Sequence, residues 1–219
     1  MKLIDTYKHK GLRKSLCSIL RKKDIKDDRV LRAMEIVPRH FFFEKAFEEK
    51  AYKDNAFPIS EGQTISQPYT VAIQTELLEV KKRDKILEIG TGSGYQTCIL
   101  IELGARVYSI ECNRKLYKSA DILLNKLNYK VNLFLGDGSL GLPTYAPFEK
   151  ILVTAGASSI PEPLIEQLKT GGIMVIPVGN KNQQKMLKIK KLINGKIETE
   201  EAGIFSFVPL VGEKSWKKP

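Results

Sequence analysis

Histidine is scarce in this chain: only His9 and His40 occur among its 219 residues. Neither lies near the glycine turn or the GQTISQPY loop, and so small a number nearly excludes a histidine-based metal site or catalytic triad. The sequence therefore argues against both, and we expect the protein to work without a metal ion.

Cysteine is also rare, and its arrangement is uninformative for metal binding. The three thiols, Cys17, Cys98 and Cys112, are scattered and form no C-x-x-C pair. An odd, scattered set favours reduced thiols in a cytosol-like compartment. The chain has no apolar run of 18 residues, and its N-terminus has no apolar segment typical of a secretory signal. We expect a cytoplasmic protein that does not enter a membrane.

Net charge is the most unusual bulk property, at +11. Residues 1–50 hold 14 basic and 8 acidic residues, residues 181–219 hold 9 and 4, and residues 51–180 hold 13 of each. Basic ends around a neutral middle are compatible with a nucleic-acid enzyme. No aromatic and basic motif accompanies the charge, so a solvated lysine-rich surface is the favoured interpretation and nucleic acid the alternative.

The order of predicted elements indicates one α/β domain. Apolar residues recur at helical spacing in residues 1–50, Pro68 is a helix-start signal, and Tyr69, Ile73, Leu77 and Val80 form an apolar stripe after it. Five strands then alternate with helices: 85–90, helix 94–103, 106–111, helix 116–127, 130–136, 150–157, helix 161–172 with a glycine stop, and 173–179.

This alternation predicts a parallel, doubly wound Rossmann-like sheet. An Asn-Gly pair between apolar runs in the C-terminal tail predicts a hairpin of antiparallel edge strands. We expect residues 1–219 to form a single domain. Residues 1–80 would supply N-terminal helices and a loop, 81–180 the cofactor-binding core and 181–219 the edge strands.

A glycine-rich turn joins the first strand to its helix. It reads Glu88-x-Gly90-Thr91-Gly92-Ser93-Gly94, and Glu111 follows at the end of the second strand. Glycines allow a sharp turn and a close approach to a ligand, and an acid at that strand end can accept hydrogen bonds from ribose hydroxyls. These residues are therefore candidates for binding a nucleoside cofactor.

The form of the turn narrows the choice of cofactor. It departs from the dinucleotide fingerprint G-x-G-x-x-G and lacks the G-K-[ST] of a P-loop. It resembles the motif of Rossmann-like S-adenosylmethionine methyltransferases, whose cofactor carries no phosphate. The cofactor's carboxylate can use the N–H groups at the helix start, and its ammonium favours an acid such as Glu88. The same resemblance implies that Asp137, in the GDG run with Gly138, reads the adenine edge; a plain turn is the alternative.

From about Val37 to the C-terminus, the chain resembles the protein-L-isoaspartate (D-aspartate) O-methyltransferase family. The segments that carry the resemblance are VPRHFF (37–42), GQTISQPY (62–69), LEIGTGSGYQT (87–97), GDGSLGLP (136–143) and APFEKILVTAGA (146–157). The resemblance implies methyl transfer to the α-carboxylate of isoaspartyl and D-aspartyl residues in damaged proteins. The ester then closes to a succinimide. Isoaspartyl proteins and peptides are the implied partners, and we expect a monomer.

The GQTISQPY loop suits this reaction. By the resemblance, Ser66 supplies the hydroxyl at the catalytic position, and Thr64 and Ile65 line the substrate groove. A carboxylate nucleophile is ionised near neutrality and needs no general base, so positioning is what remains. A lysine would stabilise the anion more than the less charged transition state, and an uncharged loop avoids this. Ser66 could instead cap the helix that follows, or do both.

Two other functions stay open at this point. A nucleic-acid methyltransferase would explain the +11 charge, although the VTAGA run after the fourth strand is not the Asn/Asp-Pro-Pro-aromatic run of amino-group methylating enzymes. A non-catalytic adaptor could keep the fold and the cofactor, although every motif is intact.

Overall fold

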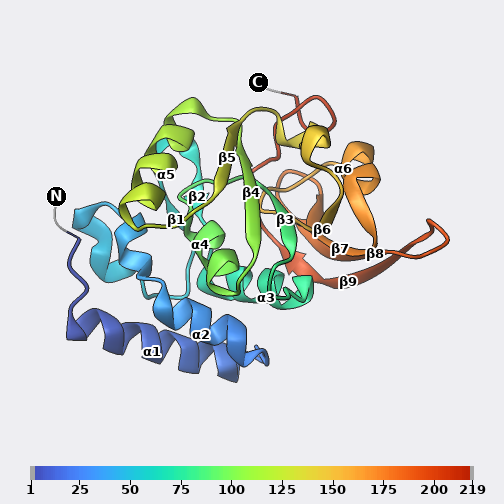
Figure 1. The fold of residues 1–219 in the computed structure, drawn as a ribbon. Helices are drawn as coiled ribbons and strands as arrows, with labels where there is room; N and C mark the ends of the chain where they lie inside the picture. Colours follow the sequence, from blue (N-terminus) through green and yellow to red (C-terminus); the bar gives the residue numbers. More distant parts are fainter. Residues whose placement is uncertain (1–2, 218–219) are drawn as a thin grey trace.

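The computed structural model describes residues 3–217 and is built around a seven-stranded sheet (Figure 1). The order across the sheet is β5-β4-β3-β6-β7-β8-β9. Neighbours from β5 to β7 are parallel, whereas β8 and β9 are antiparallel additions at one edge. The strands are β3 (Lys85–Ile89), β4 (Arg106–Glu111), β5 (Asn132–Leu135), β6 (Phe148–Val153), β7 (Leu168–Gly179), β8 (Gln184–Lys191) and β9 (Ile197–Phe205). The predicted doubly wound sheet with a C-terminal hairpin is confirmed.

Helices cover both faces of this sheet, and an N-terminal pair lies beyond one face (Figure 1). The α-helices are α1 (Tyr7–Lys22), α2 (Asp28–Ile36), α3 (Pro68–Leu78), α4 (Tyr95–Glu102), α5 (Arg114–Lys126) and α6 (Glu162–Gln167). Short 3₁₀ turns are η1 (Arg39–Phe42), η2 (Lys45–Lys50), η3 (Ser60–Gly62), η4 (Gly138–Leu140) and η5 (Pro143–Tyr145), and a two-stranded ribbon pairs β1 (Phe57–Pro58) with β2 (Thr64–Ile65).

Side-chain alternation along β3 shows how the sheet divides the core. Ile86 packs with residues of α3 and α4, whereas Leu87 and Ile89 pack on the opposite face with residues of α6. Successive side chains of a strand point to opposite faces, so Glu88 shares the face of Ile86. An acid is thereby buried under α4, a consequence considered below.

The predicted glycine stop of the helix at 161–172 is wrong. The helix ends at Gln167, and Leu168 already pairs with Phe148 of β6. Gly171 and Gly172 form an irregular stretch inside β7, where the pairing register shifts. A Cβ on Gly172 would lie 2.7 Å from the carbonyl oxygen of Lys169, so a strand bulge, not a helix end, requires glycine there.

The apolar stripe predicted for the helix after Pro68 is also not its buried face. Tyr69, Ile73 and Leu77 are only half-buried, and α3 ends at Leu78, before Val80. Thr70, Gln74 and Thr75 are buried instead. The helix is enclosed by the sheet on one side and by α1 and α2 on another, so its polar side chains bond internally: Nε2 of Gln74 donates to the Val153 carbonyl at 2.9 Å.

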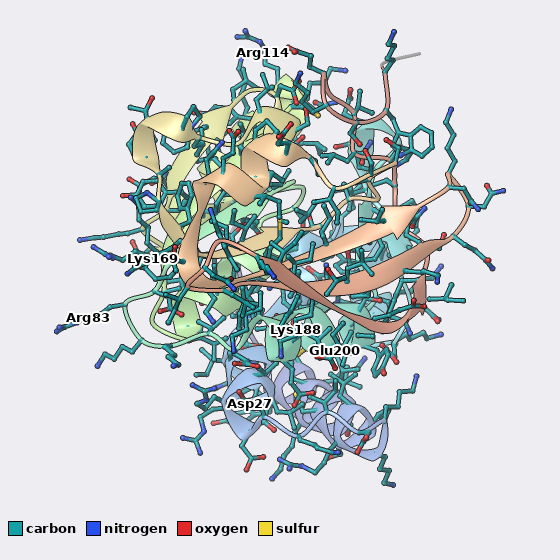
Figure 2. The ribbon with its side chains drawn as sticks, turned by 90° about the vertical axis from the view of Figure 1, so that its right-hand side faces the viewer. Asp27, Arg83, Arg114, Lys169, Lys188 and Glu200 are labelled. Atoms are coloured by element: carbon teal, nitrogen blue, oxygen red, sulfur yellow. The ribbon has the colours of Figure 1, made fainter. Side chains whose placement is uncertain are left out.

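Charged side chains surround the molecule and both signs are mixed (Figure 2). Of the labelled basic residues, Arg83 and Lys169 lie at the left of this view and Arg114 at the top, and Lys188 of β8 stands opposite Glu200 of β9 in the strand pairing. Within residues 3–217, no helix is long and apolar enough to cross a membrane.

Candidate active site

The turn between β3 and α4 uses its glycines as the sequence predicts. Gly90 has φ +94°, and a Cβ there would lie 2.5 Å from Oγ1 of Thr154. Gly94 has φ +87° and is the N-cap of α4, and a Cβ there would press against Leu124 at 3.3 Å. Gly92 has φ +55° but faces open space. The turn therefore packs tightly behind and leaves its centre accessible to a ligand.

Glu111 ends β4 beside this turn, and its carboxylate is held by main-chain N–H groups. Oε2 accepts a hydrogen bond from the amide of Gly92 at 2.9 Å, and Oε1 accepts one from the amide of Asn113 at 2.9 Å. Each carboxylate oxygen has a second acceptor site, so Glu111 can still receive two hydroxyl donors. Its side chain lines the cavity described next, as expected for a group that binds ribose.

A cavity of about 610 Å³ lies over the turn, which is within the usual range for a small-molecule site. Of the residues predicted from sequence, those that line it are Thr64, Ile65, Ser66, Gly90, Thr91, Gly92, Ser93, Glu111 and Gly138. Two lysines, Lys181 and Lys217, also line it, but neither belongs to the glycine turn. An open glycine cradle and a preset carboxylate suit an adenosyl cofactor without phosphate.

Glu88 lies beneath the cavity and not on its wall. Its side chain is fully buried, and Oε2 accepts hydrogen bonds from the hydroxyls of Thr97 and Ser109, both at 2.6 Å. Oε1 has no hydrogen-bond partner among the described residues. Burial is the main cause that raises the pKa of Glu88 to about 7, against the two hydroxyl bonds that lower it. The hydroxyl of Thr91, on the cavity wall, bonds that of Ser109 at 2.6 Å, which links Glu88 to the site.

Asp137 lies beside the cavity, but its carboxylate already accepts hydrogen bonds from other residues of the chain. Oδ1 accepts hydrogen bonds from the amide and the hydroxyl of Ser139, at 2.8 and 2.7 Å, and Oδ2 accepts one from the amide of Glu213 at 2.7 Å. It thus caps a 3₁₀ turn and anchors the C-terminal segment. Its contact with an adenine ring stays a prediction.

Ser66 stands between the β1–β2 ribbon and α3, half-buried on the cavity wall. It is not the helix cap: the N-cap residue of α3 is Gln67, whose side chain makes no capping bond. Asp54 serves instead, accepting a hydrogen bond from the amide of Tyr69 at 2.8 Å. The capping alternative for Ser66 is therefore wrong, and its hydroxyl bonds to none of the residues 3–217.

A second cavity, of about 730 Å³, meets the first along one line of residues. The two share four lining residues: Thr64, Ser66, Thr154 and Val208. The second continues beneath the end of β9 and the turn that precedes β8, over residues 182–183 and 202–208. Ser66 therefore lines both a nucleoside-sized cavity and the second cavity beside it.

The sequence analysis missed part of this wall. Thr154 follows β6 at the carboxyl end of the parallel strands, and its Oγ1 lies 2.6 Å from the carbonyl oxygen of Gly90. Residues 208–211 and Trp216 cover the cavity from the C-terminal segment, with Nε1 of Trp216 donating to the Gly156 carbonyl at 3.0 Å. The carboxyl-end position of Thr154 was a readable signal. Nothing local marks the C-terminal residues.

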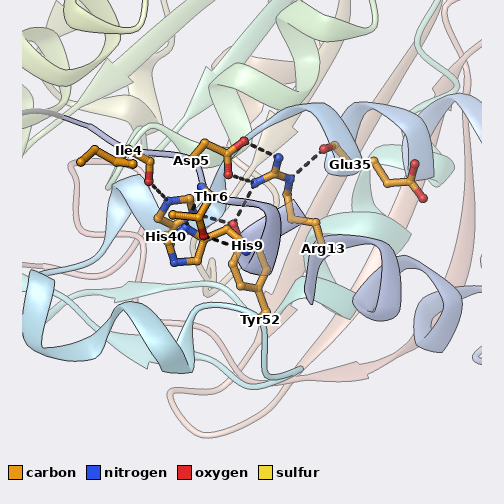
Figure 3. Close-up of polar contacts among 8 residues, drawn as sticks. All are labelled: Ile4, Asp5, Thr6, His9, Arg13, Glu35, His40 and Tyr52. Carbon is orange, nitrogen blue, oxygen red and sulfur yellow. Dashed lines mark hydrogen bonds and ion pairs between the residues drawn. The ribbon is translucent and has the colours of Figure 1, made fainter. Parts of the chain in front are cut away.

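The two histidines meet at the N-terminus, far from these cavities in sequence (Figure 3). Their rings lie 3.8 Å apart, and one potential ligand atom from each of Asp5, His9 and His40 lies within 4.8 Å of the others. Arg13 already pairs with both oxygens of Asp5 at 2.8 Å, and Nδ1 of His40 lies 2.6 Å from the hydroxyl of Tyr52. The positive charge of Arg13 would repel a metal cation at this cluster. We therefore interpret the cluster as a set of polar contacts that holds the N-terminal segment in place.

Comparison with known proteins agrees with this geometry. A family model described as protein-L-isoaspartate(D-aspartate) O-methyltransferase matches residues 11–215. A protein-L-isoaspartate O-methyltransferase of Cytophaga hutchinsonii is 54% identical over 212 residues, covering 97% of this chain and 96% of that protein. One of Flavobacterium psychrophilum is 54% identical over 212 residues, covering 96% of this chain and 99% of that protein.

Solved structures give the same result. A protein-L-isoaspartate O-methyltransferase superimposes with a TM-score of 0.83 at 28% identity, covering 93% of this chain and 67% of that chain. A Plasmodium falciparum structure described as a putative member, in complex with S-adenosyl-L-homocysteine, gives 0.78 at 26% identity, covering 93% and 98%. With its glycine turn, its Ser66 loop and a family model that matches nearly its whole length, this chain belongs to the protein-L-isoaspartate (D-aspartate) O-methyltransferase family.

Proposed function

We propose that this protein transfers a methyl group from S-adenosylmethionine to the α-carboxylate of L-isoaspartyl and D-aspartyl residues in damaged proteins. The observation that carries the proposal is the position of Ser66 on the line where two cavities meet. The cofactor motifs line one cavity, and the other, lined by the turn before β8 and the segment at the end of β9, would receive the peptide. The family membership supports the same substrate.

When bound in the first cavity, the cofactor supplies a methyl group on a positively charged sulfur. Glu111 would hold the ribose hydroxyls through its two remaining acceptor sites, and the amides of the glycine turn would hold the amino-acid carboxylate. Glu88 lies beneath this turn, where it is hydrogen-bonded to the hydroxyls of Thr97 and Ser109. Asp137 and Gly138 stay our candidates for the adenine side.

The Ser66 hydroxyl would donate a hydrogen bond to one oxygen of the isoaspartyl carboxylate and so would orient the other oxygen toward the methyl group. Its hydroxyl bonds to no described residue, so it is available for this task. Thr64 and Ile65 line the groove beside it. The bound cofactor would supply the methyl group to this oxygen, and the residues of this chain would not have to move a proton. An uncharged loop suits a step in which an anion and a cation neutralise each other.

We further propose that the three parts of the chain act as one methyltransferase domain, as a monomer, without metal, in the cytoplasm. The comparisons match protein-L-isoaspartate O-methyltransferases and give no support to a nucleic-acid substrate. The catalytic motifs are intact, which disfavours a non-catalytic adaptor.

The test uses labelled S-adenosylmethionine and two synthetic peptides that differ only in isoaspartate or aspartate at one position. We expect base-labile methyl esters on the isoaspartyl peptide alone. Ser66→Ala should lower the turnover rate by roughly 10- to 100-fold because the carboxylate loses its alignment, with cofactor affinity kept. Ser60→Ala is the matched control, since Ser60 lies in the same loop but lines neither cavity. Equal labelling of both peptides would contradict the proposal.

A further inference from the structure

Arg39 is buried behind the loop that carries Ser66, and no acid pairs with it. Its side chain is 1% exposed, and none of the ion pairs within residues 3–217 includes it. One terminal nitrogen donates to the carbonyl oxygen of Ser66 at 2.7 Å, and Nε donates to that of Ala51 at 3.0 Å. The other terminal nitrogen has no partner among the described residues.

Burying the Arg39 charge without an acid beside it destabilises the folded state, because a charge taken out of water normally needs an ionic partner. Burial lowers the pKa of the Arg39 guanidinium, and this shift is opposed by Tyr95 and, less strongly, by the charge of Asp54. Asp54 is committed elsewhere, to Lys23 at 2.6 Å and to the amide of Tyr69. The donors of Arg39 are thereby left for main-chain carbonyls. Packing alone does not explain this, since an apolar side chain of similar length would fill the space without a charge.

The carbonyl that Arg39 holds belongs to a poorly supported stretch of chain. The β1–β2 ribbon ends at Ile65, and α3 begins at Pro68, which has no amide proton. Ser66 lies between these elements and outside the hydrogen bonding of both. The bond from Arg39 therefore fixes the peptide plane after Ser66, and with it the direction of the Ser66 side chain.

The same guanidinium also contacts the cofactor side of the site. Its central carbon lies 4.7 Å from the centre of the Tyr95 ring, within the range of a cation–π contact. Tyr95 is the first residue of α4, directly after the glycine turn, and it lines the first cavity. Arg39 is thus in contact with Ser66 on one side and with the wall of the cofactor cavity on the other.

We propose that Arg39 is a positioning residue that sets the distance between the Ser66 hydroxyl and the methyl group to be transferred. This inference rests on the proposed function of Ser66, through which Arg39 acts. A displacement of about 1 Å at the reacting atoms can cost roughly 100-fold in rate, so a change at Arg39 should affect turnover although it touches neither reactant.

The test is Arg39→Lys, which keeps the charge but lacks the planar fork that serves two carbonyls and stacks on a ring. We expect the turnover rate on the isoaspartyl peptide to fall roughly 10- to 100-fold. The dissociation constant for S-adenosylhomocysteine, measured by calorimetry, should change less than about threefold, because the main cofactor contacts remain. The matched control is Arg13→Lys, which removes a buried arginine pair with Asp5 that does not contact the Ser66 loop.

A second measurement separates positioning from simple damage to the fold. If Arg39 acts through Ser66, Arg39→Lys should lower the rate by less than about threefold when Ser66 is already alanine. Additive losses in the double variant would overturn the proposal, as would equal rate losses in the two lysine variants at equal loss of thermal stability. An unmodified protein that methylates no isoaspartyl peptide would instead refute the proposed function itself, so the two failures can be told apart.

Discussion

Removing the charge of Glu88 should change how the stability of this protein depends on pH. Glu88 is fully buried, and its pKa is raised from 4.5 to about 7, chiefly by burial. The folded state therefore favours the protonated acid, whereas the unfolded chain ionises it about 2.5 units earlier. Ionisation of Glu88 destabilises the folded state, and this loss grows as the pH rises from about 4.5 through 7.

The size of the effect follows from the shift. At about 1.36 kcal/mol per pKa unit, the full loss is about 3 kcal/mol, of which about 2.5 kcal/mol develops between pH 5 and pH 8. Glu88→Gln cannot ionise and escapes this loss. Its amide also lacks a partner at the place of Oε1, but that cost is the same at every pH. The difference in unfolding free energy between the two proteins should thus shift by about 2.5 kcal/mol in favour of the glutamine variant.

Urea unfolding of both proteins without cofactor, at pH 5 and at pH 8, measures this difference directly. Glu162→Gln is the control, since that acid is exposed in the first turn of α6. A difference between wild type and Glu88→Gln that stays constant across the two pH values would refute the reasoning. It would mean that Glu88 is solvated more fully than its burial indicates, or that Oε1 has a partner in solution.

The other predictions concern two glycines and two cysteines. Gly90→Ala should abolish measurable cofactor binding in calorimetry, because φ is +94° and the added Cβ would meet Thr154 at 2.5 Å. Gly11 lies in α1 with open space around it, so Gly11→Ala should instead raise the free energy of unfolding by up to about 1 kcal/mol, as measured with urea. Cys112 is exposed and lines the cavity, whereas burial raises the pKa of Cys17 to about 12. Native protein should therefore be alkylated first at Cys112, as read by peptide mass mapping, and S-adenosylhomocysteine should slow that reaction; alkylation at an unchanged rate would contradict the placement of the cofactor.

The strands and turns could be predicted from the sequence, because their signals lie within short segments of the chain. All five parallel strands are found, with ends shifted by up to a few residues, because each is a short apolar run that alternates with a helix. The hairpin between β8 and β9 also turns at the predicted Asn-Gly pair. The glycines of the turn after β3 form the sharp turn that their spacing implied, with positive φ at Gly90, Gly92 and Gly94.

Errors arose where distant parts of the chain decide the local structure. The helix α6 ends early because Lys191, from β8, donates to the carbonyls of Ile165 and Leu168, and because Leu168 joins the sheet. The buried surface of α3 includes the polar side chain of Gln74 because Gln74 donates to a carbonyl at the end of β6. Neither partner is near in sequence, so periodicity alone could not predict these outcomes.

In the candidate site, too, the sequence identified residues of local motifs and missed residues that the fold brings in from a distance. Residues of the glycine turn and Glu111 were identified from spacing within one strand–helix–strand unit, and they line one cavity. Thr154 and the C-terminal residues reach that cavity only because the sheet brings its strand ends together. Arg39 carried no sequence signal beyond its place in a shared motif, because its importance depends on an uncompensated burial that only the packed structure reveals.

The two cavities that meet at Ser66 also bear on the order of events in a catalytic cycle. Each is lined mostly by residues of its own, and they share only four. Neither reactant therefore has to pass through the space of the other, and neither needs to be in place before the other can enter. Such a site suits random addition of substrates and independent departure of products, so that a long protein carrying several damaged positions can stay in contact with the enzyme while the spent cofactor is exchanged.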